Sequence, residues 1–250
     1  MTGTGSVWRT AHGHGFPLVV VHGTMDRSTS FGRLVRALDG FHVTRYDRRG
    51  YGRSIELGPP DSFAQQVEDL TEVVGAQPAV VVGHSYGGTV ALAASIAHRP
   101  IAGAVVYECP MPWMPWWPAR SAGAAAMADA ADPADAAERF MRRMIGDRRW
   151  EKLPPSTRAA RRAEGVTLVA EMQHVRPPSG AAFAIEDLPV PVLAVHGSQG
   201  ADHHATSIRT IAGTAPLGVY ARIEGAPHGV HLTHPREFAA LIREFVTGLD

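Results

Sequence analysis

The stretch that decides the fold is Val80-Val81-Val82-Gly83-His84-Ser85-Tyr86-Gly87-Gly88. Its three consecutive valines are typical of a strand buried on both faces. The Ala- and Leu-rich segment 89–98 that follows has helical composition. Ser85 is therefore predicted on a sharp turn between strand and helix, where Gly83 and Gly87 leave room for the chain to reverse. Because the free N–H groups of the helix lie beneath such a turn, Ser85 is the predicted nucleophile.

The composition is that of an ordinary globular protein. The chain has 250 residues, of which 45% are hydrophobic, and a formal net charge of zero. The charge balance gives no reason to expect nucleic acid or an anionic membrane as a partner. The single cysteine excludes an intramolecular disulfide, and neither a signal pattern nor an apolar run of about eighteen residues is present. We therefore expect a soluble, cytoplasmic protein with one α/β domain that carries an insertion.

Strand-like runs alternate with helical periodicity along most of the chain. Strands are predicted at 6–10, 16–21, 41–46, 80–82, 101–107, 190–195 and 218–223, and helices at 28–38, 62–74, 89–98, 203–212 and 235–247. This alternation predicts an α/β fold with a mostly parallel, doubly wound sheet and helices on both faces. Sites in such sheets lie beyond the carboxyl ends of the strands. Five residues follow predicted strands and should share that rim: Thr24, Asp47, Ser85, Glu108 and Gly197.

The alternation stops between residues 111 and 183. Three tryptophans and three prolines fall within 111–118, and the remainder is rich in alanine and arginine without a strong strand pattern. We predict a helical cap over 111–183 on a core domain formed by 1–110 and 184–250. The three tryptophans either line an apolar substrate pocket or fix the cap to the core; they are Trp113, Trp116 and Trp117. A basic face of the cap is expected to be solvated, with contact to a substrate carboxylate as the alternative; it comprises Arg139, Arg142, Arg143, Arg148 and Arg149.

A serine nucleophile needs a base in contact with its hydroxyl. Of the thirteen histidines, His228 is the best placed, because it follows the last predicted strand and precedes the closing helix. It therefore belongs to the same rim as Ser85. His84 is next to the serine in sequence, but its side chain should point the other way along the strand and either pack or hydrogen-bond locally.

The remaining histidines near these positions are given no catalytic role. His231 and His234 follow His228 at intervals of three, yet the trio lacks the carboxylate or cysteine pattern of a zinc site. No metal is expected. His203 and His204 are interpreted as the solvated start of a helix.

Four motifs, in this order, resemble those of the α/β-hydrolase superfamily: His22-Gly23, Asp47-Arg48-Arg49-Gly50-Tyr51-Gly52-Arg53-Ser54, Gly83-His84-Ser85-Tyr86-Gly87-Gly88, and Gly225-Ala226-Pro227-His228 with Pro235 and Phe238 after it. The resemblance covers nearly all of the chain outside 111–183. It implies an oxyanion hole formed by the backbone N–H groups of Tyr86 and Thr24, with Met25 as the alternative to Thr24. Met25 is also expected to contact the substrate. The loop 47–54 is interpreted as a structural brace of the rim.

The third catalytic residue departs from the common pattern of the superfamily. Many relatives carry an Asp three residues after a Gly that ends a strand before the histidine, but here Gly197, after the predicted strand 190–195, is followed at that position by Gly200. Asp202 lies two positions further on. Glu108 instead follows the strand after the nucleophile helix, where a subset of the superfamily has its acid. We favour Glu108, with Asp202 as the alternative.

The resemblance implies a serine hydrolase that cleaves a carboxylic ester or lactone of a small, largely apolar substrate through an acyl-enzyme, without metal or organic cofactor. Two other functions stay open. One is another reaction on the same site, either cofactor-free perhydrolysis of the haloperoxidase type or carbon–carbon bond hydrolysis. The other is a small-molecule receptor with slow turnover. Neither the substrate nor the oligomeric state is indicated by the sequence.

Overall fold

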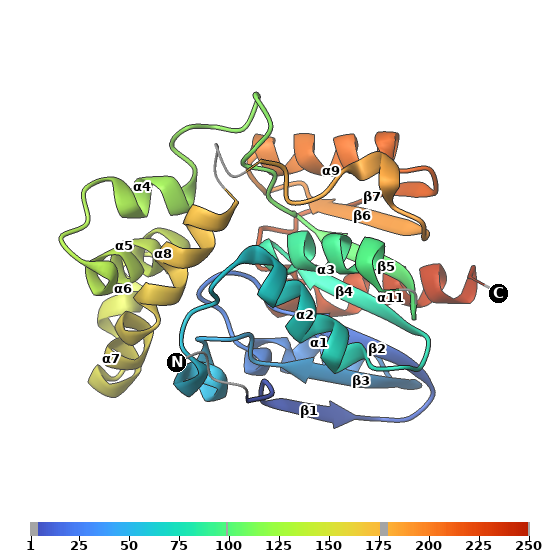
Figure 1. Ribbon diagram of the computed structural model, residues 1–250, viewed down its shortest axis with the longest axis horizontal. Coiled ribbons are helices and arrows are strands. Elements are labelled where there is room, and N and C mark those ends of the chain that lie inside the picture. Colours follow the sequence, from blue (N-terminus) through green and yellow to red (C-terminus); the bar gives the residue numbers. More distant parts are fainter. Residues whose placement is uncertain (1–4, 99, 176–179, 250) are drawn as a thin grey trace.

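A seven-stranded sheet forms the centre of the computed structural model, which describes residues 5–98, 100–175 and 180–249 (Figure 1). The strand order is β1-β3-β2-β4-β5-β6-β7. Only the edge strand β1 is antiparallel to its neighbour, and the other pairs are parallel. The predicted, mostly parallel α/β sheet is therefore confirmed. Its strands are β1 (Arg9–His12), β2 (Phe16–Val21), β3 (Phe41–Tyr46), β4 (Ala79–His84), β5 (Ile101–Tyr107), β6 (Val192–Gly197) and β7 (Gly218–Ile223).

Helices cover both faces of the sheet, and each face has its own apolar cluster. Leu70 of α2 and Val90 of α3 pack in one cluster with Val81 of β4. Val80 and Val82 point to the opposite face, into a second cluster that contains residues of α1 and α11. This explains why three successive valines are needed in β4. The helices beside the sheet are α1 (Gly32–Ala37), α2 (Phe63–Val74), α3 (Tyr86–Ala97), α9 (Asp202–Thr214), α10 (Val230–Thr233) and α11 (Pro235–Thr247).

Two predicted elements near the N-terminus differ from the structure. The helix expected over 28–38 is a 3-10 turn, Ser28–Phe31, followed by the short helix α1. Ser28 is the first residue of the 3-10 turn, and its N–H donates to Asp47 Oδ1 at 2.8 Å. The first strand begins at Arg9 because Trp8 N–H donates to the Ser54 hydroxyl at 2.9 Å. Both differences arise from contacts with the loop that follows β3.

A group of helices lies beyond the carboxyl end of the sheet, between β5 and β6 in the chain (Figure 1). A third apolar cluster joins these helices to the core, since Phe140 and Leu168 pack there with Met25 and Tyr51. Within the residues that the structure describes, 111–183 contains no strand. These helices, called the cap below, are α4 (Ala122–Ala128), α5 (Pro133–Ile145), α6 (Asp147–Glu151), α7 (Pro155–Ala163) and α8 (Gly165–His174).

Across the three described ranges, no helix is long and apolar enough to cross a bilayer.

Candidate active site

Ser85 lies alone on the turn between β4 and α3, with a φ of +52° and a ψ of −128°. A non-glycine residue held in such a conformation costs of order 1–3 kcal/mol, which the surrounding structure must offset. The two glycines are required by close packing. A Cβ on Gly83 would overlap Gly88, and one on Gly87 would overlap the Val21 carbonyl oxygen. The steric reason predicted for both glycines is confirmed.

Backbone strain is concentrated at this rim. Among the described residues other than glycine, only Met25, Ser85 and Glu108 have a positive φ. They lie beyond the carboxyl ends of β2, β4 and β5, three adjacent strands of the sheet. Strain of this kind clusters at sites of function, because only there does the fold retain it.

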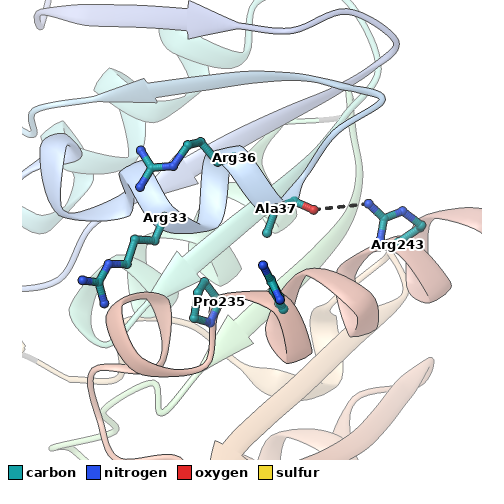
Figure 2. A pocket seen from close by; sticks show the side chains of 6 residues that line it. Arg33, Arg36, Ala37, Pro235 and Arg243 are labelled. Carbon is teal, nitrogen blue, oxygen red and sulfur yellow. Dashed lines mark hydrogen bonds between the residues drawn. The ribbon is translucent and has the colours of Figure 1, made fainter.

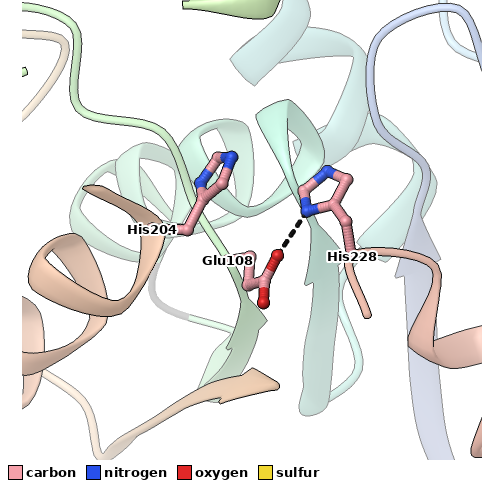
Figure 3. A group of neighbouring side chains, drawn as sticks. All are labelled: Glu108, His204 and His228. Carbon is pink, nitrogen blue, oxygen red and sulfur yellow. Dashed lines mark hydrogen bonds and ion pairs between the residues drawn. The ribbon is translucent and has the colours of Figure 1, made fainter. Parts of the chain in front are cut away.

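Glu108 and His228 are joined by a short hydrogen bond (Figure 3). The His228 Nδ1 and Glu108 Oε2 atoms are 2.5 Å apart, and the Glu108 side chain is completely buried. The second carboxylate oxygen accepts a hydrogen bond from the Gly197 N–H at 3.1 Å. With Nδ1 occupied in this way, the imidazole has its Nε2 atom free to act as a base.

Gly200 occupies the position where many relatives carry their acid. A Cβ there would overlap the Glu108 Oε1 atom, so the Glu108 carboxylate fills the space that a side chain at 200 would need. Asp202, the alternative acid, is an exposed residue in the first turn of α9. In the described part of the chain it forms no ion pair with His228. The geometry therefore favours Glu108 as the partner of His228.

The loop that carries His228 is held by residues at the ends of β4 and β5. The Tyr107 hydroxyl donates to the Pro227 carbonyl at 2.9 Å, and His84 Nε2 lies 2.8 Å from the His228 carbonyl. The pKa of His84 is held well below its usual value, mainly by burial and next by electrostatic repulsion from His231. His84 is therefore neutral, and its Nε2–H donates the hydrogen bond to the His228 carbonyl. His231 stacks on Phe31 with ring centroids 4.1 Å apart. His84 and His231 thus support the site by packing.

His204 is the residue that sequence reasoning missed. Its ring stacks on His228 at 4.8 Å between centroids and contacts Trp117 edge-on at 5.4 Å. His204 does lie at the start of a helix, as predicted, but the expectation that it is solvated is wrong, because the first turn of α9 lines the cavity. Its position in the sequence could have indicated this, because His204 follows shortly after β6, whose carboxyl end lies at the rim. Burial, and next the charge of His228, lower the pKa of His204, which keeps it neutral.

Glu108, His204 and His228 also form a group with metal-ligand chemistry (Figure 3). One donor atom from each lies within 4.8 Å of the other two. A zinc ion bound at about 2.0–2.2 Å would require its ligands closer together than that limit. Two of the three donors are moreover engaged with each other through the hydrogen bond at 2.5 Å. The arrangement fits an acid–base pair better than a metal centre.

A cavity of about 440 Å³ contains the candidate residues. Five of the residues predicted for the site line it, namely Thr24, Ser85, Tyr86, Trp117 and His228. The backbone N–H groups of Thr24 and Tyr86 have no acceptor among the described residues, as an oxyanion hole requires. The other predicted substrate contacts do not line this cavity: Met25 is buried in the cluster between cap and core, and Trp113 and Trp116 pack against the core.

A second hollow, of about 590 Å³, lies between α1 and α11 (Figure 2). Four arginines, Ala37 and Pro235 line it, and the Arg243 guanidinium donates to the Ala37 carbonyl at 3.3 Å. None of these side chains is a nucleophile or a base at neutral pH. The candidate nucleophile Ser85 and the candidate base His228 line the cavity of about 440 Å³ instead.

A fully buried ion pair lies directly behind the Thr24 loop. The Arg48 guanidinium contacts the Glu171 carboxylate of α8, and both side chains are at most 1% exposed. Glu171 also accepts hydrogen bonds from the Thr24 hydroxyl at 2.9 Å and from the Tyr51 hydroxyl at 2.8 Å. Gln66 Nε2 donates to the other carboxylate oxygen at 3.0 Å. One carboxylate from the cap thus joins four residues of the core.

Arg48 in turn holds the strand end that leads into Thr24. Its Nε donates to the His22 carbonyl at 2.8 Å and its Nη2 to the Gly23 carbonyl at 3.0 Å. Asp47 fixes the neighbouring loop by accepting from the Ser28 and Arg53 N–H groups. The loop 47–54 therefore braces the rim, as predicted.

Two buried histidines make stability sensitive to acid. Burial, and then the charge of Arg48, lower the pKa of His22 to about 3. Burial, and then the charge of His228, lower the pKa of His231 to about 3. An unfolded histidine has a pKa near 6.5, so below this pH the unfolded state binds protons that the folded state excludes. Their contribution to stability is complete above pH 6.5 and is lost as the pH falls toward 3.

We therefore expect the free energy of unfolding to fall by up to roughly 2 kcal/mol for each histidine between pH 6.5 and pH 5. Urea denaturation at a series of pH values measures this slope. His231→Phe, which keeps an aromatic ring against Phe31, should reduce the slope. Equal stability of the wild type at pH 7 and pH 5 would contradict the argument.

The fold and the site together define a class of protein. Its members have a mostly parallel sheet, a serine on a strained strand–helix turn, and a histidine paired with a buried carboxylate. The chain belongs to the alpha/beta hydrolase family, whose profile matches residues 18–241. Among curated proteins, it is 38% identical over 81 residues to the bifunctional esterase/perhydrolase DCH of Acinetobacter calcoaceticus. That alignment covers 30% of this chain and 29% of the relative.

Solved structures resemble the chain over almost its entire length. A bromoperoxidase from Bacillus anthracis has a TM-score of 0.71 at 23% identity, with 96% of this chain and 95% of that chain covered. An esterase from Thermogutta terrifontis has a TM-score of 0.72 at 22% identity, with 97% and 93% covered. At these identities the likeness establishes the shared fold.

Proposed function

We propose that the protein is a serine hydrolase that cleaves a carboxylic ester or lactone of a small, largely apolar substrate. The observation that carries the proposal is the 2.5 Å hydrogen bond between Glu108 and His228 at the cavity that Ser85 also lines. This arrangement supplies a nucleophile, a base and an acid that orients the base. The family and the esterase relatives support a hydrolase.

The reaction proceeds in two halves on the same residues. Ser85 Oγ attacks the substrate carbonyl while His228 Nε2 takes its proton, and the N–H groups of Thr24 and Tyr86 stabilise the negative oxygen. Each such donor typically contributes about 3–4 kcal/mol to transition-state stability. His228 then protonates the leaving alkoxide, which departs as an alcohol. Water attacks the acyl-enzyme by the same route and releases the carboxylic acid.

Glu108 acts through His228. Its Oε2 holds the proton on Nδ1, so that Nε2 has a lone pair directed away from Glu108, and its negative charge stabilises the imidazolium that forms during attack. The Gly197 N–H fixes the other carboxylate oxygen, which prevents the acid from turning away from the histidine.

Perhydrolysis is the second candidate, favoured by the relative described as an esterase/perhydrolase and by the bromoperoxidase neighbour. Hydrogen peroxide would replace water in attack on the acyl-enzyme and yield a peracid. Assaying peracid formation from acetate and hydrogen peroxide tests this route. Peracid formed by wild type but not by Ser85→Ala would add perhydrolysis to the proposed function.

Labelling with a fluorophosphonate tests the proposal. We expect intact-mass spectrometry to detect one phosphonyl adduct per chain, peptide mapping to locate it on Ser85, and ester hydrolysis to stop as the adduct forms. Ser85→Ala is the matched control and should remain unlabelled. If the wild type, shown to be folded by circular dichroism, acquires no adduct on Ser85, the nucleophile assignment is wrong.

A further inference from the structure

The charged side chains that line the cavity at Ser85 are all basic. Apart from histidines, the charged side chains that line it are Arg120, just before α4, and Arg143, on α5. No Asp or Glu lines the cavity among the described residues. Glu108 lies next to the site, but both of its oxygens are engaged by His228 and by the Gly197 N–H. The charged groups that a substrate meets on the cavity wall, histidines aside, are therefore guanidinium groups.

Arg143 differs from the two other arginines of α5, which pair with acids. Arg139 pairs with Asp135 at 2.8 Å, and Arg142 with Glu138 at 2.8 Å. Within the part of the chain that the structure describes, Arg143 has no carboxylate within ion-pairing distance. The basic face is solvated as expected, since all of it except the half-buried Arg142 is exposed. On α5 it is divided, because Arg139 and Arg142 pair with acids whereas Arg143 also lines the cavity.

The helical repeat of α5 explains this division. Phe140, Arg143 and Met144 all line the cavity, since residues three and four apart lie on one side of a helix. Glu138 and Arg142 lie on the other side, within the ion pairs of the cap. Arg120 is placed less specifically, because it also lines a neighbouring hollow together with Asp132. Arg143 is therefore the principal free cation of the cavity.

We propose that the natural substrate carries a carboxylate, which Arg143 binds with Arg120 beside it while Ser85 attacks an ester or lactone carbonyl elsewhere in the same molecule. This inference rests on the proposed function and deepens it. A guanidinium recognises a carboxylate through two parallel hydrogen bonds, and a cavity of one sign concentrates ions of the opposite sign.

The rest of the cavity wall defines the body of the substrate. Its larger apolar side chains are Phe140, Met144, Met172, Val175 and Trp117. Such a wall suits an uncharged hydrocarbon segment between the two polar ends. The substrate class is therefore a half-ester of a dicarboxylic acid, or a lactone with a carboxylate on its side chain.

A pair of esters that differ only at the far end tests the inference. One is mono(4-nitrophenyl) suberate, and the other has a carboxamide in place of its carboxylate. We expect wild type to prefer the acid in kcat/KM by about tenfold or more, and this preference to fall in 0.5 M salt as ions screen the charges. Arg143→Gln should bring the ratio close to one, and Arg143→Lys should retain part of it.

Arg236→Gln is the matched control, because Arg236 lines the separate hollow between α1 and α11. It should keep the wild-type ratio. The ratio of two esters on one preparation does not depend on how much of a variant is folded. Equal rates for both esters in wild type, or an unchanged ratio in Arg143→Gln, would overturn the inference alone. Turnover of neither ester, with no adduct on Ser85, would overturn the proposed function with it.

Discussion

Replacing Glu108 by glutamine is expected to lower kcat by roughly 10³- to 10⁴-fold, in line with the loss of the acid from other serine triads. Both carboxylate oxygens accept hydrogen bonds, one from His228 Nδ1 and one from the Gly197 N–H. A glutamine amide has a single acceptor oxygen. If this oxygen faces Gly197, the NH₂ group donates to Nδ1 and fixes the tautomer in which Nε2 carries a proton and cannot act as a base.

Steady-state hydrolysis of a 4-nitrophenyl ester measures this loss, and the rate of phosphonylation of Ser85 should fall with it. Asp202→Asn, at the exposed alternative acid, is the control and should keep the wild-type kcat. Loss of activity in Asp202→Asn with an active Glu108→Gln would reverse the assignment of the acid.

A stricter test uses the space beside Gly200, which the Glu108 carboxylate fills. Glu108→Ala removes the carboxylate and vacates the space beside residue 200. Gly200 has no positive φ, so its backbone accepts a side chain. The double variant Glu108→Ala/Gly200→Asp is expected to recover part of the kcat that Glu108→Ala loses. A double variant no more active than Glu108→Ala would indicate that an acid at position 200 cannot reach His228.

Glu171→Leu is expected to lower the free energy of unfolding by about 3–5 kcal/mol, because it leaves the Arg48 guanidinium buried without a counter-charge. The Thr24 and Tyr51 hydroxyls lose their acceptor at the same time. Urea denaturation monitored by tryptophan fluorescence measures the change. Activity should fall as well, since Arg48 and Glu171 hold the loop that contains the Thr24 N–H.

Two variants separate the buried charge from other effects of the substitution. The double variant Arg48→Met/Glu171→Leu removes both charges and should regain much of the lost stability, as replacement of buried pairs by apolar side chains often does. Glu151→Gln weakens exposed ion pairs with Arg142 and Arg158 and should cost less than about 1 kcal/mol. A Glu171→Leu protein as stable as Glu151→Gln would show that the buried pair contributes little.

The sequence alone determined the features that depend on neighbouring residues. Alternating apolar runs and helical periods located most strands and helices, because burial on a sheet or helix face imposes a period that a short window contains. The valines before Ser85 and the glycines around it predicted the turn, since the steric demand of that turn is local. The position of His228 followed from chain order in a parallel sheet.

Only the tertiary structure decided which distant side chains meet. Glu108 and Asp202 were both compatible with the sequence, and the space beside Gly200 distinguished them. The Arg48–Glu171 pair joins residues 123 positions apart, and His204 reaches His228 from another helix. Contacts of this kind leave no period or spacing in the sequence, because they depend on how the cap and the helices pack against the rim.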